Sequence, residues 1–194
     1  MIPDPIETFS ALYAQASAAG PEADAMVLAT VDPDGRPSAR YVLLKGVDAR
    51  GFVFYTNLGS RKASALAAHP YASLCFYWSP IGRQVRVEGS VERVSGEEAD
   101  AYFATRPRAS QIGAWASAQS TPLESRETLV QRVAEARERF EGGDVPRPPF
   151  WSGYRVVPSA IEFWTSDPAR LHVRERFARE GGGRGEWRRE LLFP

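Results

Sequence analysis

The N-terminal segment has its apolar residues at helical spacing. Ile6, Phe9 and Tyr13 recur every three or four residues, which places their side chains on one face of a helix. Asp4 followed by Pro5 is a typical helix start, because aspartate caps free N–H groups and proline fits the first turn. The pattern therefore predicts a helix that begins near Asp4 and buries one apolar stripe.

Most of the remaining chain carries short apolar or alternating runs between turn residues, which is the pattern of β-strands. We expect strands at residues 25–31, 38–46, 51–57, 71–78, 83–94 and 154–164, with a final hairpin of 170–180 and 185–193 across the loop GGGRG. Helical patterns interrupt them at residues 61–69, 96–105 and 125–140. No internal repeat or long linker divides the chain. The sequence therefore predicts one mainly β domain over residues 1–194, an antiparallel barrel with peripheral helices.

The amino-acid composition limits which cellular compartment and which classes of binding partner we expect. Lysine plus arginine and aspartate plus glutamate number 24 each, so no net field favours nucleic acid or a membrane surface. The first residues lack the basic and apolar regions of a secretory signal, and no apolar run reaches the length of a membrane span. The single cysteine, Cys75, lies in an apolar run and is expected to be a buried thiol in a reducing compartment. We therefore expect a cytoplasmic protein without nucleic-acid or membrane partners and, with only two histidines, without a metal site.

The segment RLHVR near the C-terminus is the strongest local sign of chemistry. In a β-strand, Arg170, His172 and Arg174 would share one face, with Leu171 and Val173 on the other. Two guanidinium groups beside an imidazole suit an anion, since arginine offers a planar fork of donors and histidine changes charge near neutral pH. A solvated edge strand, which basic residues often decorate, explains the same pattern equally well.

The segment Ser60-Arg61-Lys62 is a second candidate anion site. Ser60 is expected to cap the helix that follows, and helix N-termini present free N–H groups and a positive dipole end. Two cations in the first turn oppose that dipole, and a bound anion would relieve the conflict. An ordinary solvated helix start is the alternative, which these residues alone favour. The chain has no P-loop and no GxGxxG motif, so side chains and helix ends must hold any nucleotide phosphate.

Six motifs in collinear order connect these segments. They are RYVLLKG (40–46), FYTN (54–57), SRK (60–62), RQVRVEG (83–89), SQIGAW (110–115) and IEFW (161–164) followed by RLHVR (170–174). Together they closely resemble the pyridoxine/pyridoxamine 5′-phosphate oxidases, flavoenzymes that make pyridoxal 5′-phosphate. The resemblance runs from about residue 4 to the C-terminus. It implies the flavin-binding split barrel, a homodimer, and flavin mononucleotide (FMN) as the cofactor.

The resemblance also implies which residues bind FMN. The SRK segment would help to hold the phosphate, while amide and hydroxyl side chains elsewhere suit the hydrogen-bonding edge of the flavin ring. Trp164 taken alone would more often be a core or interface aromatic. The implied FMN contacts are Arg40, Tyr41, Val42, Leu43, Leu44, Lys45, Tyr55, Thr56, Arg61, Lys62, Gln84, Gln119, Ser120, Trp164 and Arg174.

A further set of matched positions would bind a phosphorylated B6 vitamer as substrate. Tyr102 and Arg106 lie one helical turn apart, whereas Pro107 argues against a helix that continues to Ser110. The resemblance places the substrate phosphate on the first four of the following residues and its pyridine ring beside the last three. These substrate contacts are Lys45, Tyr102, Arg106, Ser110, Arg170, Leu171 and His172. Arg170 and His172 are the implied catalytic residues.

The implied reaction oxidises pyridoxamine or pyridoxine 5′-phosphate to pyridoxal 5′-phosphate, with O2 as electron acceptor. Two positions depart from the family pattern: Val173 stands where an acidic residue is usual, and Thr165 where glutamine, histidine or glycine is usual. Since alternation turns Val173 away from Arg174, we expect changed surroundings of the site and no lost contact. Two alternatives stay open. One is a related flavin oxidase of the phenazine-pathway type acting on another ring substrate, and the other is a non-catalytic protein that binds flavin or pyridoxal phosphate.

Overall fold

The computed structural model describes residues 2–179 and 185–194, which contain nine strands and five α-helices. The strands are β1 (Ala25–Val31), β2 (Pro37–Leu43), β3 (Gly46–Asp48), β4 (Gly51–Asn57), β5 (Tyr71–Trp78), β6 (Arg83–Arg93), β7 (Trp151–Thr165), β8 (Val173–Ala178) and β9 (Arg188–Leu192). The helices are α1 (Pro5–Ala19), α2 (Arg61–Ala68), α3 (Gly96–Thr105), α4 (Arg108–Ala116) and α5 (Arg126–Arg139), and a short 3₁₀ turn, Ser79–Ile81, follows β5.

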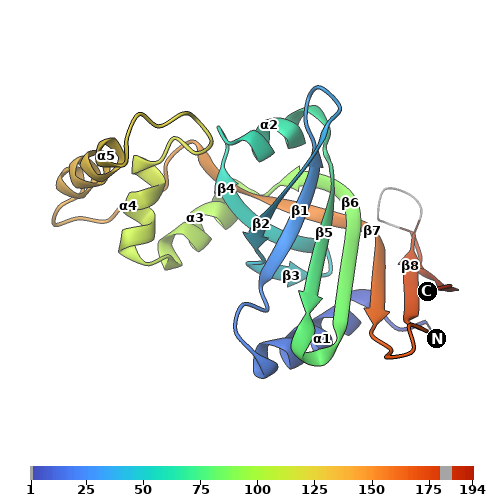
Figure 1. Cartoon of the computed structure of the whole chain (residues 1–194). Helices are drawn as coiled ribbons and strands as arrows, with labels where there is room; N and C mark the ends of the chain where they lie inside the picture. Colours follow the sequence, from blue (N-terminus) through green and yellow to red (C-terminus); the bar gives the residue numbers. More distant parts are fainter. Residues whose placement is uncertain (1, 180–184) are drawn as a thin grey trace.

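All nine strands belong to one curled antiparallel sheet (Figure 1). Hydrogen-bonded neighbours follow the order β2-β1-β5-β6-β7-β4-β3, and β8 pairs with both β7 and β9. The long strand β7 divides the sheet. On one side it pairs with β6, and on the other it pairs first with β4 and then with β8. The strand-rich antiparallel architecture with helices outside the sheet agrees with the prediction from the sequence.

The helices lie in three places around the sheet. Helix α1 crosses one end of the curled sheet, α2 lies at the opposite end, and α3, α4 and α5 form a group that projects from one side (Figure 1). The main core forms where α1 meets the sheet: the Phe9 ring lies 4.8 Å from Phe52 and 5.0 Å from Phe76, measured between centroids. A smaller core joins the helical group to β7 through Phe103 and Trp151, whose rings are 5.0 Å apart in an edge-to-face contact. The start of β7 therefore belongs to both the sheet and the helical group.

Most predicted elements are present, with differences after β2, after α3 and at the start of β8. The strand expected at residues 38–46 ends at Leu43, and the short strand β3 follows it, so the chain forms a β3–β4 hairpin that the pattern does not predict. Pro107 ends α3 as expected, but it is also the N-cap of α4, which begins at once and was not predicted. Cys75 is only partly buried. The predicted GGGRG loop lies outside the described residues except for its last glycine.

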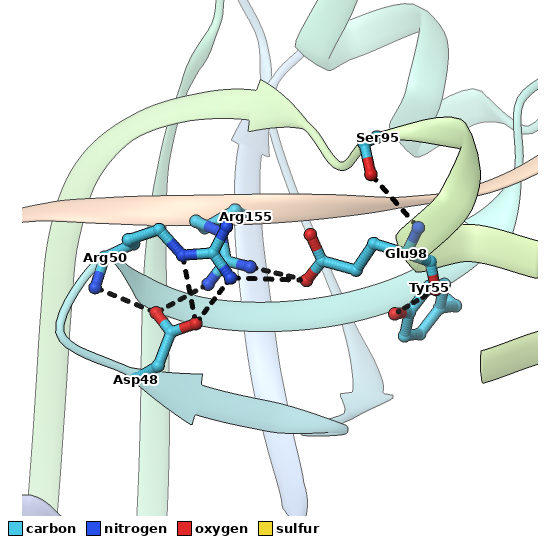
Figure 2. Close-up of polar contacts among 6 residues, drawn as sticks. All are labelled: Asp48, Arg50, Tyr55, Ser95, Glu98 and Arg155. Atoms are coloured by element: carbon cyan, nitrogen blue, oxygen red, sulfur yellow. Dashed lines mark hydrogen bonds and ion pairs between the residues drawn. The ribbon is translucent and has the colours of Figure 1, made fainter. Parts of the chain in front are cut away.

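A buried arginine ties the helical group to the sheet (Figure 2). Arg155 on β7 has a side chain that is 2% exposed, and its guanidinium donates to Asp48 of β3 at 2.9 Å and to Glu98 of α3 at 2.5 Å. Glu98 lies in the first turn of α3, where its backbone N–H is capped by the Ser95 hydroxyl at 3.0 Å. Arg50 completes the cluster from the β3–β4 turn, with a 2.7 Å ion pair to Asp48. The start of α3 is therefore fixed against the sheet by charge.

This cluster predicts a large stability effect at Arg155. Arg155→Met removes the hydrogen-bonded partner of Glu98 and leaves Asp48 with Arg50 alone, so we expect unfolding to become easier by about 2 kcal/mol. The measurement is urea denaturation followed by tryptophan fluorescence. Arg50→Met is the matched control, because its exposed ion pair should be worth about 1 kcal/mol or less. Equal losses for the two variants would show that burial of Arg155 is not what matters.

Candidate active site

A hollow of about 500 Å³ gathers much of the predicted site. It lies where β2, β4, α3 and α4 meet, and a size of this order is usual for small-molecule sites. A second hollow of about 560 Å³ lies against α4 and α5, but of the predicted residues only Gln119 lines it. The predicted residues that line the first hollow are Tyr41, Val42, Leu43, Lys45, Tyr55, Thr56, Lys62, Tyr102, Arg106, Ser110 and Gln119.

Lys62 forms one cationic end of this hollow. Its residue is 9% exposed, and its ammonium donates to the Thr56 hydroxyl at 3.1 Å, the Gln119 side-chain oxygen at 3.1 Å and the Ser60 hydroxyl at 3.4 Å. No carboxylate among the described residues pairs with it. Burial, with a smaller effect from the nearby Arg40, lowers the pKa of Lys62. An anion at this point would relieve both effects, because it restores the charged state that burial penalises.

Two further cations stand behind Lys62 without lining the hollow. Arg61 pairs with Asp32, and Arg40 donates to the Thr30 hydroxyl at 2.7 Å and the Ser38 hydroxyl at 2.6 Å. Burial lowers the pKa of Arg40, Asp32 opposes that shift and Arg61 adds to it. Asp32 is itself 7% exposed, and its second carboxylate oxygen has no hydrogen-bond partner. Asp32 therefore acts on two cations in this corner, Arg61 and Arg40.

Arg106 forms a second cationic end. It is the C-cap of α3, and its guanidinium lies over the Trp151 ring at 4.8 Å and the Phe103 ring at 5.5 Å. One terminal nitrogen of Arg106 is buried without a hydrogen-bond partner, and no carboxylate of the described residues pairs with it. Burial lowers the pKa of Arg106, while Tyr102 acts in the opposite direction. A buried donor without a partner costs free energy, so Arg106 is suited to receive an anionic ligand.

Lys45 and Ser110 complete this second end. Lys45 follows β2, and its ammonium forms a 2.8 Å ion pair with Asp24, which precedes β1. Ser110 lies in the first turn of α4. Although Pro107 interrupts the helix, as predicted, α4 begins so soon afterwards that Ser110 lines the same hollow as Arg106. The four residues implied to hold the substrate phosphate thus line one hollow.

Three of the residues that line the hollow, Tyr55, Tyr102 and Trp151, form one aromatic stack, which we call the Tyr55 floor. The Tyr55 ring lies 4.0 Å from Tyr102 and 5.2 Å from Trp151, and all three are nearly parallel. Burial, with help from Glu98 and Tyr102, raises the pKa of Tyr55 to about 12, so its hydroxyl stays neutral at physiological pH. Gly153 pairs with Tyr55 across β4 and β7, and a Cβ atom there would lie 2.7 Å from the Tyr55 ring. Because residue 153 has no side chain, the Tyr55 ring can pack directly against the backbone of β7.

The remaining predicted residues are elsewhere in the chain. Gln84, Trp164 and Arg174 are neighbours in register across β6, β7 and β8, so their side chains project from the same face of the sheet. His172 packs on Trp164 with 4.6 Å between ring centroids. None of these four lines the hollow, and Arg40, Leu44, Arg61, Ser120, Arg170 and Leu171 do not line it either. The predicted site therefore falls into two separate groups within one chain.

The prediction that RLHVR is a strand is wrong for its first three residues. Strand β8 begins at Val173, and Arg170 has a left-handed backbone with φ of 64°. The cause is a local turn: the Asp167 carboxylate accepts the N–H of Ala169 at 2.8 Å and of Leu171 at 3.3 Å, and His172 Nδ1 accepts the N–H of Asp167 at 3.1 Å. Arg170 and His172 are thus presented by a loop, and a neutral His172 keeps its proton on Nε2.

Arg174 is held in place by Glu162. This glutamate of β7 is 5% exposed and accepts from Arg174 at 2.8 and 3.2 Å, and Arg86 of β6 is its second partner. Burial alone would raise the pKa of Glu162, but the hydrogen bonds and charges of Arg174 and Arg86 outweigh it and lower the pKa overall. Its stabilising effect is present above the ordinary glutamate pKa and is lost as the pH falls through the lowered value.

Comparison with known proteins agrees with this geometry. The sequence profile described as pyridoxamine 5′-phosphate oxidase matches residues 13–140, and that of the pyridoxine 5′-phosphate oxidase C-terminal dimerisation region matches residues 151–194. The chain belongs to the pyridoxamine 5′-phosphate oxidase family. It is 61% identical to the pyridoxine/pyridoxamine 5′-phosphate oxidase of Rubrobacter xylanophilus, over 99% of this chain and 88% of the relative. It is 59% identical to that of Myxococcus xanthus, over 99% of this chain and 92% of the relative.

Solved structures of the pyridoxamine 5′-phosphate oxidase family share the fold. PhzG from Burkholderia lata, in complex with tetrahydrophenazine-1-carboxylic acid, superposes with a TM-score of 0.92 at 34% identity, covering 98% of this chain and 93% of PhzG. A pyridoxamine 5′-phosphate oxidase-related, FMN-binding protein from Nostoc punctiforme has a TM-score of 0.79 at 19% identity over the whole of both chains. The fold is thus the antiparallel split barrel that the sequence predicts.

Both departures from the usual pyridoxamine 5′-phosphate oxidase pattern lie at one edge of the second group. Thr165 pairs with Val173 across β7 and β8, and its hydroxyl accepts a hydrogen bond from Arg83. Val173 is 54% exposed and adjacent to Arg174, so it faces away from that side chain as expected. It does not pack into the core of the chain. Thr165 therefore has a polar partner of its own, and neither departure removes a contact of Arg174.

Sequence reasoning missed several residues that line or adjoin the hollow of this family member. Trp151 and Asn57 pair across β4 and β7, and both line it. Asp24 and Asp32 neutralise cations near its two ends. The sequence offers a signal only for Trp151, through its aromatic side chain. The roles of Asp24 and Asp32 can be recognised only after the structure shows that they pair with Lys45 and Arg61. No described helix is long and apolar enough to cross a membrane, and no metal-binding group of three or more His, Cys, Asp or Glu occurs among the described residues.

The Tyr55 floor gives a prediction for Gly153. In Gly153→Ala the new methyl group would overlap the Tyr55 ring, so the ring must tilt and the stack with Tyr102 and Trp151 must loosen. We expect FMN, added to the purified protein, to bind roughly tenfold more weakly, about 1.4 kcal/mol, as measured by quenching of flavin fluorescence. Gly143→Ala is the control, because a Cβ there meets nothing within 4 Å. Unchanged FMN affinity in Gly153→Ala would mean that the stacked floor does not contribute to binding.

Proposed function

We propose that this protein is an FMN-dependent oxidase that converts pyridoxamine or pyridoxine 5′-phosphate to pyridoxal 5′-phosphate, with O2 as electron acceptor. The observation that carries the proposal is the pair of cations, Lys62 and Arg106, that share one hollow and lack carboxylate partners among the described residues. Each is suited to a separate phosphate, one on the cofactor and one on the substrate. The relatives named for this activity, at about 60% identity, support the same assignment.

The residues of the hollow fit FMN. Lys62 would hold the phosphate, with Arg61 and Arg40 adding positive charge behind it. Thr56 and Gln119, which bond to one another at 3.0 Å and both accept from the Lys62 ammonium, would add a hydroxyl and an amide beside that phosphate. When bound, the flavin supplies the redox chemistry by accepting electrons from the substrate and passing them to O2. The protein binds, orients and shields the reactants.

The substrate would occupy the other end of the hollow. Arg106, Lys45, Tyr102 and Ser110 would surround its phosphate. Arg170 and His172 would approach from a second subunit. There His172 would donate from Nε2, because its Nδ1 already accepts the Asp167 N–H. Arg170 would present a fork of donors from the left-handed turn.

A homodimer explains why the site falls into two groups. Trp151 in the hollow and Trp164 in the second group are thirteen residues apart on β7, or up to about 43 Å along an extended strand. We therefore assign the two groups to different FMN molecules. The second group lies on a sheet face that also exposes Tyr77, in register with Gln84, and that face suits a two-fold partner. We propose that each FMN lies between the hollow of one subunit and the Trp164 group of the other.

The second candidate is a flavin oxidase acting on a carboxylated ring, which the likeness to the PhzG complex supports. The phosphate-directed wall of Lys45, Tyr102, Arg106 and Ser110 favours a phosphorylated substrate instead. Oxygen uptake by purified, FMN-loaded protein separates the two functions. Turnover with pyridoxamine or pyridoxine 5′-phosphate supports our proposal. Absence of turnover with both compounds would reject it.

Substitution at the two cationic ends should separate the two ligands. Lys62→Ala should weaken FMN, and Arg106→Ala should raise the substrate KM, because each removes a charge-assisted hydrogen bond worth about 1.5–3 kcal/mol, or roughly one to two decades of affinity. Flavin fluorescence gives the first quantity and oxygen uptake at saturating FMN the second. If Arg106→Ala loses FMN while it keeps its substrate KM, the assignment of the two ends is reversed.

Mixed dimers test whether the site is shared between subunits. Arg106→Ala and Arg170→Ala impair opposite halves, so each homodimer should be poorly active at low substrate concentration. After unfolding and refolding an equimolar mixture, activity should rise to about one quarter of wild type, because half of the random dimers are mixed and one of their two sites is intact. Light scattering should give a dimer throughout. No recovery in a mixture that does form mixed dimers would place both residues in the same subunit's site.

A further inference from the structure

We propose that Asp24 is a built-in competitor for Lys45, and that it sets how tightly the active site holds the phosphate of both substrate and product. The inference rests on the proposed function, since it concerns the phosphate end of the same hollow. Among the four residues assigned to that phosphate, Lys45 is the one whose cation already has a carboxylate partner, the 2.8 Å pair with Asp24. Arg106 by contrast has no such partner in the described part of the chain.

The backbone fixes Asp24 and Lys45 beside one another. The N–H of Leu44 donates to the carbonyl of Asp24 at 2.8 Å, and the N–H of Lys45 donates to the carbonyl of Val53 at 2.8 Å. The two main chains therefore stay in place when the side chains separate. Asp24 lies just before β1, so its carboxylate comes from outside the strands and helices that carry the other phosphate contacts. Its position does not depend on the ligand.

The ion pair is suited to be displaced. The side chains of Lys45 and Asp24 are 27% and 28% exposed, so water screens their attraction, and exposed pairs of this kind are weak. A phosphate monoester carries nearly two negative charges at neutral pH and three strong acceptor oxygens, so it outcompetes a single carboxylate for the ammonium. Asp24 must then give up its partner or remain as a nearby like charge. Either outcome weakens phosphate binding.

Substrate and product carry the same phosphate, so the counter-ion weakens both. When the product leaves, Asp24 recovers Lys45, so the Lys45 cation does not stay unpaired in the hollow. Asp24 is thus a residue that lowers affinity at the phosphate end and favours release. Structural damage would lower affinity when Asp24 is changed, whereas loss of a competitor must raise it, and this difference in sign makes the proposal testable.

The test is Asp24→Asn, which keeps the shape and the backbone bond but removes the charge. Isothermal titration of the FMN-loaded dimer with pyridoxal 5′-phosphate, and separately with inorganic phosphate, should show tighter binding by roughly two- to fivefold, the size expected for an exposed charge pair. The substrate KM should fall by a similar factor. Asp144→Asn is the matched control: Asp144 is exposed and does not line the hollow, and its removal should leave both affinities unchanged.

Unchanged or weaker phosphate binding in Asp24→Asn, with FMN affinity intact, would overturn the proposal. Equal tightening in Asp144→Asn would also overturn it, because the effect would then come from net charge. The titrations do not need turnover. If the wild-type protein fails to oxidise either vitamer, the proposed function fails, yet the comparison of Asp24→Asn with wild type still decides the role of Asp24.

Discussion

Burial of the Arg155 guanidinium group constrains the part of the candidate site that α3 carries. Arg155 is almost wholly inaccessible on β7, so its charge must be met by carboxylates at close range, and Asp48 and Glu98 meet it from two different elements. Since Glu98 lies in the first turn of α3, this requirement fixes where the helix starts. Tyr102 is one turn further along the same face, where its ring stacks on Tyr55. The position of Tyr102, one of the residues that we propose to hold the substrate phosphate, therefore follows from a buried charge that does not line the hollow.

The hollow itself is organised by incomplete charge compensation. Lys62 and Arg106 have lowered pKa values because burial penalises their charged forms, and neither has a carboxylate partner among the described residues. An anion bound at Lys62 opposes the effect of burial and raises its pKa toward the ordinary lysine value. Asp32 and Asp24 offset part of the remaining positive charge at the two ends. The charges of Lys62 and Arg106 are thus left uncompensated by the described carboxylates, and two anionic groups of bound ligands would compensate them.

Regular elements could be predicted from the sequence, because periodicity and caps act over a few residues. The cap of α1 by Asp4, the end of α3 at Pro107 and the strand alternation of β1 and β5 are such features. The motif matches likewise gave most of the residues that line the hollow. The RLHVR segment could not be predicted in this way, because the Asp167 turn replaces strand geometry with side-chain bonds to the backbone. Trp151 and Asp24 were missed for a different reason: their roles arise from contacts distant in sequence.

The long strand β7 joins the two halves of this arrangement. Its first residues include Trp151, Gly153 and Arg155, which shape the hollow and its floor. Its last residues include Glu162, which binds Arg174, and Trp164, which belongs to the second group. The matched C-terminal dimerisation region, residues 151–194, spans the whole of β7, β8 and β9. In the proposed dimer the strands that associate are therefore the strands that support the ligand. Because Glu162 holds Arg174 and Arg86 together across three strands, loosening that cluster would weaken association and flavin binding together.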